Sequence, residues 1–325
     1  MLDVLDWFPG VPIFFMISGL LVTHSFVRLP TVLQFFQHRA LRIYPGLWAC
    51  LIVSFLLAAA QGDLESRSLF LKTVVWAGLQ GTFFQFVNFY VNPGVTNGAL
   101  WSIATELQFY LALPVMAAVG ARYVRNRWHA SLIIVGLSVF SAIVHEWTLV
   151  RQNELLPSLF PTLYASLLSN GFLFAFGVLA YLWKDKLYKL CRERLLYFLA
   201  LYVGCRVILS MFGLSSTQVH TGLLCLVVYP MLGLVVYSFA FSWQNLSGQL
   251  LKGHDYSFGI YIYHMPVIYA ALHWGIDGLQ GLGLVSITVG LLAVASWRLV
   301  ERPALGLKQR LGVSTAASLG TERGR

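Results

Sequence analysis

The stretch LWSIATELQFYLALP, residues 100–114, has the composition of a membrane-spanning helix, yet it carries an acid, Glu106. A charged carboxylate at the centre of a span costs roughly 2.5–3.5 kcal/mol. Ser102 and Tyr110 lie four residues before and after Glu106, so on a helix the three side chains share one face. This polar face should point into a helix bundle or a water-filled cavity. The stretch alone fits a functional acid and a structural acid bonded to a neighbouring helix equally well.

The rest of the chain has the same apolar character. Of its 325 residues 58% are hydrophobic and 11% are charged, and the mean hydropathy is +0.72. A soluble domain carries about 25% charged residues, so the composition predicts an all-α, polytopic transmembrane helix bundle in a lipid bilayer. Candidate apolar segments lie near 11–27, 43–60, 69–90, 100–119, 131–150, 159–183, 196–213, 221–243, 258–275 and 281–300.

The net charge of +9 comes from basic residues in short stretches between the apolar segments. This pattern follows the positive-inside rule and argues against nucleic acid as a partner. The four cysteines are scattered without metal-ligand or disulfide spacing, so they indicate small core residues and no metal site. The basic stretches that should face the cytoplasm are 26–42, 122–129, 184–194 and 302–310.

The segment 69–90 is the weakest candidate span, because it contains Lys72 and several side-chain amides. If this segment does not cross, all four basic stretches lie on one side of the membrane. The sequence then predicts about nine crossings plus one re-entrant or non-spanning segment, with the N-terminus outside and the C-terminus in the cytoplasm. We expect a membrane domain over residues 1–310 and a disordered cytoplasmic tail over 311–325.

The element HRALRIYPGLW, residues 38–48, places Arg39 and Arg42 one helical turn apart. Two guanidinium groups at this spacing suit a single phosphate, which they bind in a planar, bidentate manner. Ordinary arginines at the cytoplasmic flank of a span are the interpretation that the residues alone favour. Pro45 is expected in the first turn of the helix that follows.

The element GVPIFFMISGLLVTHSF, residues 10–26, contains Gly10 and Gly19, which we expect to allow close approach between helix backbones. Ser18 lies beside the second glycine, where its hydroxyl could bond to a neighbouring helix. This side chain is therefore a candidate to line a polar cavity.

In DYSFGIYIYHMPVIY, residues 255–269, Pro266 removes the backbone hydrogen bond to the carbonyl of Ile262. Such a kink exposes backbone groups, and we expect them to face a ligand cavity. His264 lies beside the kink, with Tyr261 nearby. A bonded core histidine is the equally weighted alternative.

Two further ionisable residues lie in apolar surroundings. Arg206 is a lone cation in a span and needs a partner, for which Glu106 is a candidate. Glu301 ends the last span and is interpreted as a helix-end anchor.

Taken together and in order, these stretches resemble the acyltransferase-3 family of membrane-bound acyltransferases. The similarity is carried by five elements between residue 10 and about residue 303, namely GVPIFFMISGLL, RALRIYP, LWSIATELQFYLALP, SFGIYIYHMPVI and ERP. One such element would be weak, whereas the ordered set is specific.

The resemblance implies a ten-helix fold that moves an acyl group, often acetyl, from cytoplasmic acyl-CoA to a hydroxyl of a glycan, lipid-linked sugar or small glycoside. It implies a bacterial inner-membrane location and no bound cofactor, with acyl-CoA as co-substrate. The family's first helix, which carries its catalytic histidine, has no counterpart in this sequence, so we expect that helix to be missing. By resemblance Arg39 and Arg42 bind CoA phosphates, and Glu106 and His264 are the catalytic candidates. The expected cavity lining is Ser18, Trp101, Ser102, Tyr110, Tyr261 and Arg206.

Two alternatives remain open at this point. A polar cavity without a complete catalytic set also fits a transporter or flippase for a polar or lipid-linked substrate. A family member without the histidine helix could instead bind CoA or a partner without chemistry.

Overall fold

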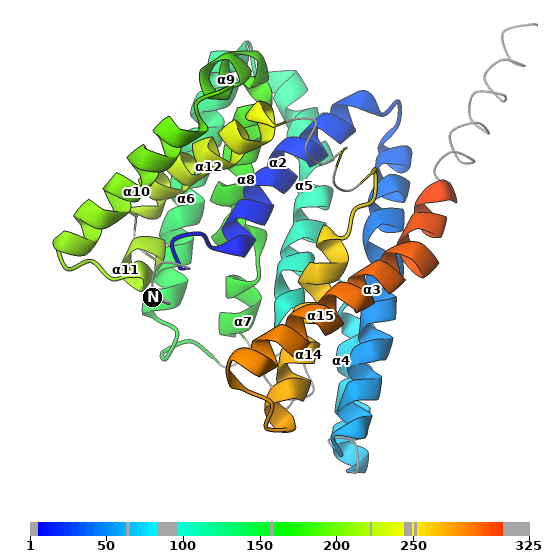
Figure 1. The fold of residues 1–325 in the computed structure, drawn as a ribbon. Coiled ribbons are helices and arrows are strands. Elements are labelled where there is room, and N and C mark those ends of the chain that lie inside the picture. Colours follow the sequence, from blue (N-terminus) through cyan, green and yellow to red (C-terminus); the bar gives the residue numbers. More distant parts are fainter. Residues whose placement is uncertain are drawn as a thin grey trace, which may run out of the picture. The chain divides into compact units, whose positions relative to one another are not determined.

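The computed structural model describes residues 6–62, 66–82, 97–156, 159–221, 223–243, 249 and 252–307. Over this part of the chain the secondary structure is entirely helical. The chain forms two compact units, whose helices are labelled in Figure 1. The first unit comprises Met1–Arg28 and Thr105–Gly253, and the second comprises Leu29–Ala104 and His254–Arg325. The division falls inside helix α5 (Trp101–Tyr123).

Seven helices or helix pairs in the described residues are long and apolar enough to cross a membrane, or eight if the bent pair α9 (Lys184–Cys191) and α10 (Leu195–Met211) is one span. These elements confirm the predicted all-α membrane bundle, whereas the number of nine crossings stays a prediction. The seven are α2 (Gly10–Arg28), α3 (Val32–Ala60), η1 (Gly98–Leu100) with α5, α6 (Arg127–Val150), α7 (Leu159–Tyr164) with α8 (Leu167–Leu182), α12 (Cys225–Ser242), and Gly278–Leu307, which begins with α15 (Gly278–Ser296).

The weakest predicted span coincides with α4 (Arg67–Leu79), which has 13 residues. A helix of this length is shorter than the roughly 20 residues that a span needs. The remainder of the predicted segment, from residue 83 onward, lies outside the described residues, as does the predicted tail over 311–325.

In the first unit α8 packs against both α2 and α6, and α12 packs against α2, α6 and α10. The approach of α2 to α8 depends on two glycines. A Cβ atom at Gly19 would lie 2.3 Å from the carbonyl oxygen of Phe174, and one at Gly177 would lie 2.3 Å from that of Met16. The close approach expected at Gly19 is therefore confirmed. The same expectation was wrong for Gly10, because no atom lies within 4 Å of a Cβ there.

The predicted continuous segment 159–183 is broken between α7 and α8. The hydroxyl of Thr105 on α5 donates to the carbonyl of Ala165 at 3.0 Å, and the Gln108 side-chain oxygen accepts from the backbone N–H of Leu167 at 2.7 Å. Ser166 caps α8 by accepting from the N–H of Ser169. These bonds satisfy backbone groups that would be costly to leave unpaired at membrane depth. The broken span therefore explains the polar residues that flank Glu106.

In the second unit α3 begins earlier than the sequence predicted. Thr31 caps the helix by accepting from the N–H of Gln34 at 3.2 Å, so Arg39 and Arg42 lie within the helix. Pro45 is therefore inside α3 and not in its first turn, which corrects the expectation.

Helix α14 (Ser257–His273) packs against α3 and α15 in the same unit. A Cβ atom at Gly259 of α14 would lie 2.8 Å from the Cα of Ala293, so α14 and α15 approach closely at this glycine. A π-helical stretch, η2 (Trp297–Glu301), continues α15 and contacts α3. This contact brings Glu301 to the helix that carries the two arginines.

Candidate functional site

The first unit contains a buried carboxylate held by hydroxyl groups. Glu106 has 5% of its surface exposed. Its Oε1 accepts a hydrogen bond from Ser18 Oγ at 2.7 Å and another from Tyr110 OH at 2.6 Å. The bond to Tyr110 confirms that the two residues share one face of α5, and the bond to Ser18 joins this face to α2. Both donors are neutral, so they stabilise a carboxylate without supplying a positive charge.

Aromatic rings pack near this carboxylate. The ring of Phe174 on α8 stacks against Phe15 of α2 and against Phe109 of α5, with centroids 4.4 and 4.5 Å apart. Phe15, Phe109 and Phe174 are all buried. The three rings therefore join α2, α5 and α8 within the first unit.

The backbone carbonyl that loses its helical donor at Pro266 of α14 finds other donors within the second unit. The carbonyl of Ile262, four residues before Pro266, accepts from Asn97 Nδ2 at 2.6 Å and from the Cys50 thiol at 3.1 Å. Both donors are buried. Pro266 does free this carbonyl as predicted, but the expectation that the freed group faces a ligand cavity was wrong. Neighbouring side chains satisfy it, as a buried backbone carbonyl requires.

His264 and Tyr261 lie next to this proline. The Nδ1 atom of His264 bonds to the backbone carbonyl of Tyr261. Since a carbonyl only accepts, Nδ1 is the donor in this bond, and in the matching neutral tautomer Nε2 is the acceptor. The Tyr261 hydroxyl lies 2.6 Å from Ser102 Oγ and 2.8 Å from the carbonyl of Ala99. The structure thus brings together three of the predicted residues, Ser102, Tyr261 and His264, with Trp101 half-buried at the start of α5.

Arg42 forms a charged cluster in the second unit with residues that the sequence reasoning did not connect to it. One terminal nitrogen lies 2.6 Å from Asp255 Oδ2, and the other lies 3.8 Å from Glu301 Oε2. Arg39 is half-buried one turn earlier on α3. The helix-end interpretation of Glu301 was incomplete, because this buried acid also faces an arginine. Asp255 was not connected to Arg42 because 213 positions of sequence separate the two residues.

Arg206 lies in the first unit with its guanidinium carbon 5.6 Å from the centroid of the Trp7 ring, a cation–π arrangement. It is buried, as the lone-cation argument requires. The hydroxyl of Tyr202, one turn before Arg206, donates to the Trp7 carbonyl. The contact with Trp7 was missed because no periodicity links the N-terminal segment to α10. Glu106 as a partner of Arg206 stays a prediction.

His220 on α11 (Ser216–Thr221) belongs to the same surroundings as Arg206. Its Nε2 contacts the carbonyl of Asp6 at 2.9 Å, and its Nδ1 accepts from the hydroxyl of Tyr229 at 3.0 Å. Burial lowers the pKa of His220; the bond to the Asp6 carbonyl opposes this shift, and the charge of Arg206 adds to it. Both ring nitrogens are therefore used by a neutral imidazole, which fixes the N-terminal segment against α11 and α12.

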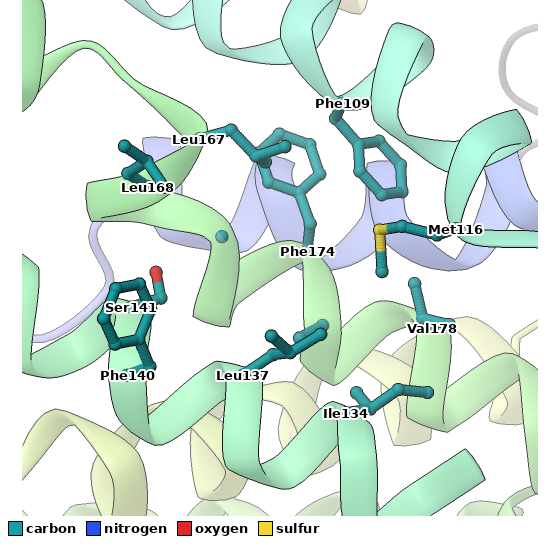
Figure 2. A pocket seen from close by; sticks show the side chains of 12 residues that line it. Phe109, Met116, Ile134, Leu137, Phe140, Ser141, Leu167, Leu168, Phe174 and Val178 are labelled. Atoms are coloured by element: carbon teal, nitrogen blue, oxygen red, sulfur yellow. The ribbon is translucent and has the colours of Figure 1, made fainter. Parts of the chain in front are cut away.

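A cavity of about 200 Å³ lies between α5, α6 and α8 of the first unit (Figure 2). Its lining is apolar except for Ser141, whose hydroxyl already accepts the backbone N–H of Phe172 at 3.1 Å. Such a lining offers no partner to a phosphate or a sugar hydroxyl. No predicted site residue lines it, so this cavity is not the polar cavity that the sequence predicted. Figure 2 shows the labelled rings of Phe109 and Phe174 at its wall.

Among the described residues, no cluster of three or more histidine, cysteine or acidic side chains has the arrangement of a metal site. Cys50, Cys191 and Cys225 are buried and Cys205 is half-buried, all as free thiols.

The helices and the buried ionic groups define the class of protein as an integral, polytopic helical membrane protein with polar sites inside its bundle. The family model described as "Acyltransferase domain" matches residues 8–297. The chain therefore belongs to the acyltransferase-3 family, as the ordered motifs predicted. It is an acyltransferase that transfers groups other than aminoacyl groups, which decides against the transporter interpretation.

Three relatives support this assignment. Nodulation protein 10 of Rhizobium leguminosarum bv. viciae is 29% identical over 334 residues, covering 95% of this chain and 85% of the relative. The O-acetyl transferase of Shigella phage Sf6 is 25% identical over 305 residues, covering 90% and 83%. The peptidoglycan O-acetyltransferase OatA of Listeria monocytogenes is 27% identical over 151 residues, covering 42% and 24%. No solved structure matches this chain.

Proposed function

We propose that this protein transfers an acetyl group from acyl-CoA to a hydroxyl of a glycan or a lipid-linked sugar in the bacterial cytoplasmic membrane, with its C-terminus in the cytoplasm. The observation that carries the proposal is the family match over residues 8–297. The names of two relatives, an O-acetyl transferase and a peptidoglycan O-acetyltransferase, support acetyl as the group and a glycan hydroxyl as the acceptor. The basic stretches at helix ends support the orientation.

In the proposed reaction the acceptor hydroxyl oxygen attacks the thioester carbonyl carbon. A new C–O ester bond forms, the C–S bond breaks, and the hydroxyl proton ends on the sulfur of CoA. A positioned base accelerates such a step by about 10²–10⁴-fold. We assign this role to His264, and its Nδ1 bond to the Tyr261 carbonyl supports the assignment because it leaves Nε2 as the proton acceptor.

Glu106 is proposed to act in proton transfer through its two hydroxyl partners. The short bonds from Ser18 and Tyr110 to one carboxylate oxygen support this role, because hydroxyl groups both donate and accept. Each hydroxyl can pass a proton on by donating its own hydrogen and accepting another.

Arg39 and Arg42 are proposed to bind the phosphates of CoA. Their spacing of one turn on α3 supports this role, as does the fork geometry of guanidinium groups toward phosphate. Trp101, Ser102, Tyr261 and Arg206 remain candidates for contact with the substrates.

The test uses bacterial membranes that contain the protein expressed from its full reading frame, supplied with radiolabelled acetyl-CoA and isolated surface glycans. We expect label in an alkali-sensitive ester on the glycan, and we expect Glu106→Gln and His264→Gln each to reduce it by about 10²-fold or more. Glu154→Gln, which changes an exposed acid paired with Arg151, is the matched control and should keep full activity. Absence of labelled ester with every acyl-CoA and glycan supplied would contradict the proposal.

A further inference from the structure

Arg42 lies between two carboxylates of very different exposure, and all of its described partners belong to the second unit. Asp255 precedes α14 and approaches one edge of the guanidinium at 2.6 Å, while Glu301 of η2 lies 3.8 Å from the other terminal nitrogen. The ring of Phe258 lies 5.7 Å from the guanidinium carbon. One guanidinium group is thus shared by two carboxyl groups.

Glu301 is fixed in this cluster. Its side chain is 2% exposed, and its Oε1 accepts from Ser296 at 2.8 Å. A Cβ atom at Gly46 would lie 3.3 Å from its carboxyl carbon, so α3 packs directly over the acid. Removing Arg42 would leave the buried carboxylate without this compensating charge, which is unfavourable in a low-dielectric interior. Of the two acids that face Arg42, Glu301 is therefore the one that solvent reaches less.

Asp255 differs in each of these respects. Its side chain is 46% exposed. Its Oδ1 accepts from the backbone N–H of Ser257 at 3.2 Å and from the Ser257 hydroxyl at 2.6 Å, so only Oδ2 is used for Arg42. The adjacent His254 accepts from the indole N–H of Trp297 at 2.9 Å, which anchors the loop. Asp255 can therefore release Arg42 while it remains solvated and bonded to Ser257. Losing a partly exposed ion pair of this kind costs little.

We propose that Asp255 occupies the edge of Arg42 that an anionic phosphate of the acyl donor takes, so that donor binding exchanges Asp255 for the phosphate while Glu301 stays bound. This inference rests on the proposed function, in which Arg42 binds the donor. A phosphate monoester carries a charge of about −1.5 to −2 and binds the same guanidinium fork as a carboxylate. Asp255 thus lowers the affinity for the donor and keeps Arg42 paired when the donor is absent.

The test measures binding of CoA and of adenosine 3′,5′-bisphosphate to the purified full chain in lipid nanodiscs, for wild type, Asp255→Asn, Asp255→Ser and Arg42→Gln. Asparagine and serine both keep a side-chain oxygen that can accept from the backbone N–H of Ser257, while they remove the competing charge. We expect both Asp255 variants to bind CoA about two- to fivefold more tightly, with a steeper dependence on salt, and Arg42→Gln to bind about tenfold or more weakly. Glu154→Gln, which also removes an acid paired with an arginine, should bind as wild type does.

The outcomes separate this inference from the function on which it rests. If Arg42→Gln binds CoA as wild type does, the donor site itself is wrong. If Arg42→Gln weakens binding but neither Asp255 variant strengthens it, the donor site stands and the exchange is wrong. Melting temperatures without ligand show whether each variant is folded.

Discussion

Two buried carboxylates, Glu106 in the first unit and Glu301 in the second, differ in the side chains that contact their oxygens. Glu106 is 5% exposed and receives hydrogen bonds from the hydroxyls of Ser18 and Tyr110. Glu301 is 2% exposed and receives one hydroxyl bond, from Ser296, but it also faces the guanidinium of Arg42. Two hydroxyl groups hold the first acid, and a guanidinium group faces the second.

The difference in contacts indicates a different role for each acid. A carboxylate opposite an arginine gains most from remaining charged, because protonation would leave the cation uncompensated. A carboxylate among hydroxyls loses less when it takes up a proton, since a hydroxyl can reverse its role from donor to acceptor. Proton transfer is therefore expected at Glu106, and anchoring of a phosphate-binding arginine is expected at Glu301.

The largest expected effect separates the two acids by the same substitution. Glu106→Gln keeps the shape of the side chain but removes its proton-transfer capacity, so kcat should fall by about 10²-fold or more with little change in CoA affinity. Glu301→Gln should instead change CoA affinity and lower the melting temperature, because Arg42 loses its buried partner. Steady-state kinetics and CoA titrations on both variants check this. Equal kcat losses would remove the distinction between the acids.

A smaller effect is expected from the glycine beside Ser18. Gly19→Ala places a methyl group 2.3 Å from the Phe174 carbonyl, so α2 must shift and Ser18 moves away from Glu106. We expect a loss of about 1–3 kcal/mol in stability, with reduced activity and unchanged CoA binding. Gly10→Ala on the same helix is the control, since its Cβ would meet no atom within 4 Å. Thermal unfolding in detergent tests both, and similar melting temperatures for the two variants would contradict the close-packing argument.

The matched serines provide a finer comparison. Ser18→Ala and Ser296→Ala each remove one hydroxyl that donates to a buried carboxylate, at 2.7 and 2.8 Å. Each loss should cost about 1–2 kcal/mol of stability, since hydrogen bonds to charged groups are worth somewhat more than average. Activity should fall severalfold only for Ser18→Ala, because Glu301 still has Arg42. A larger activity loss for Ser296→Ala would reverse the roles proposed for the two regions.

The smallest effect concerns His220, which belongs to neither carboxylate region. Burial lowers its pKa from the ordinary 6.5, so the unfolded chain binds a proton at a higher pH than the folded chain does. The contribution of His220 to stability is complete above 6.5 and is lost as the pH falls from there toward its lowered folded value.

His220→Gln should therefore show a weaker fall in melting temperature than wild type between about pH 7 and pH 5. Any fall in melting temperature at acid pH that remains in this variant comes from the carboxylates or from other histidines. A pH profile identical to that of wild type would show that the surroundings of His220 do not favour its neutral form.

Much of the fold followed from local patterns. Apolar runs predicted most helices to within a few residues, because an apolar run of this length can only span a membrane as a helix. The polar face of α5 was also predictable, since it depends only on the helical repeat of Glu106 and Tyr110. The extension of α3 back to Val32 was missed, as was the break before Ser166, because both depend on capping and on partners from other helices.

The candidate sites also combine residues that the sequence pointed out with contacts that only the structure revealed. Spacing singled out Glu106, Arg42 and His264, but it did not reveal that Asp255 and Glu301 face Arg42. Those contacts join residues more than two hundred positions apart in the chain. Likewise, the sequence located the carbonyl that Pro266 frees, whereas only the structure showed that this carbonyl accepts a hydrogen bond from Asn97.

The sequence by itself determined that this chain is a membrane-embedded helical acyltransferase with ionic groups inside its spans, because hydropathy, helical repeat and motif order are local properties. Only the tertiary structure decided which partner each buried charge has, and whether that partner is a hydroxyl or a counter-ion. The physical reason is that a charge in a low-dielectric interior is governed by atoms within a few ångströms, and those atoms come from distant parts of the chain.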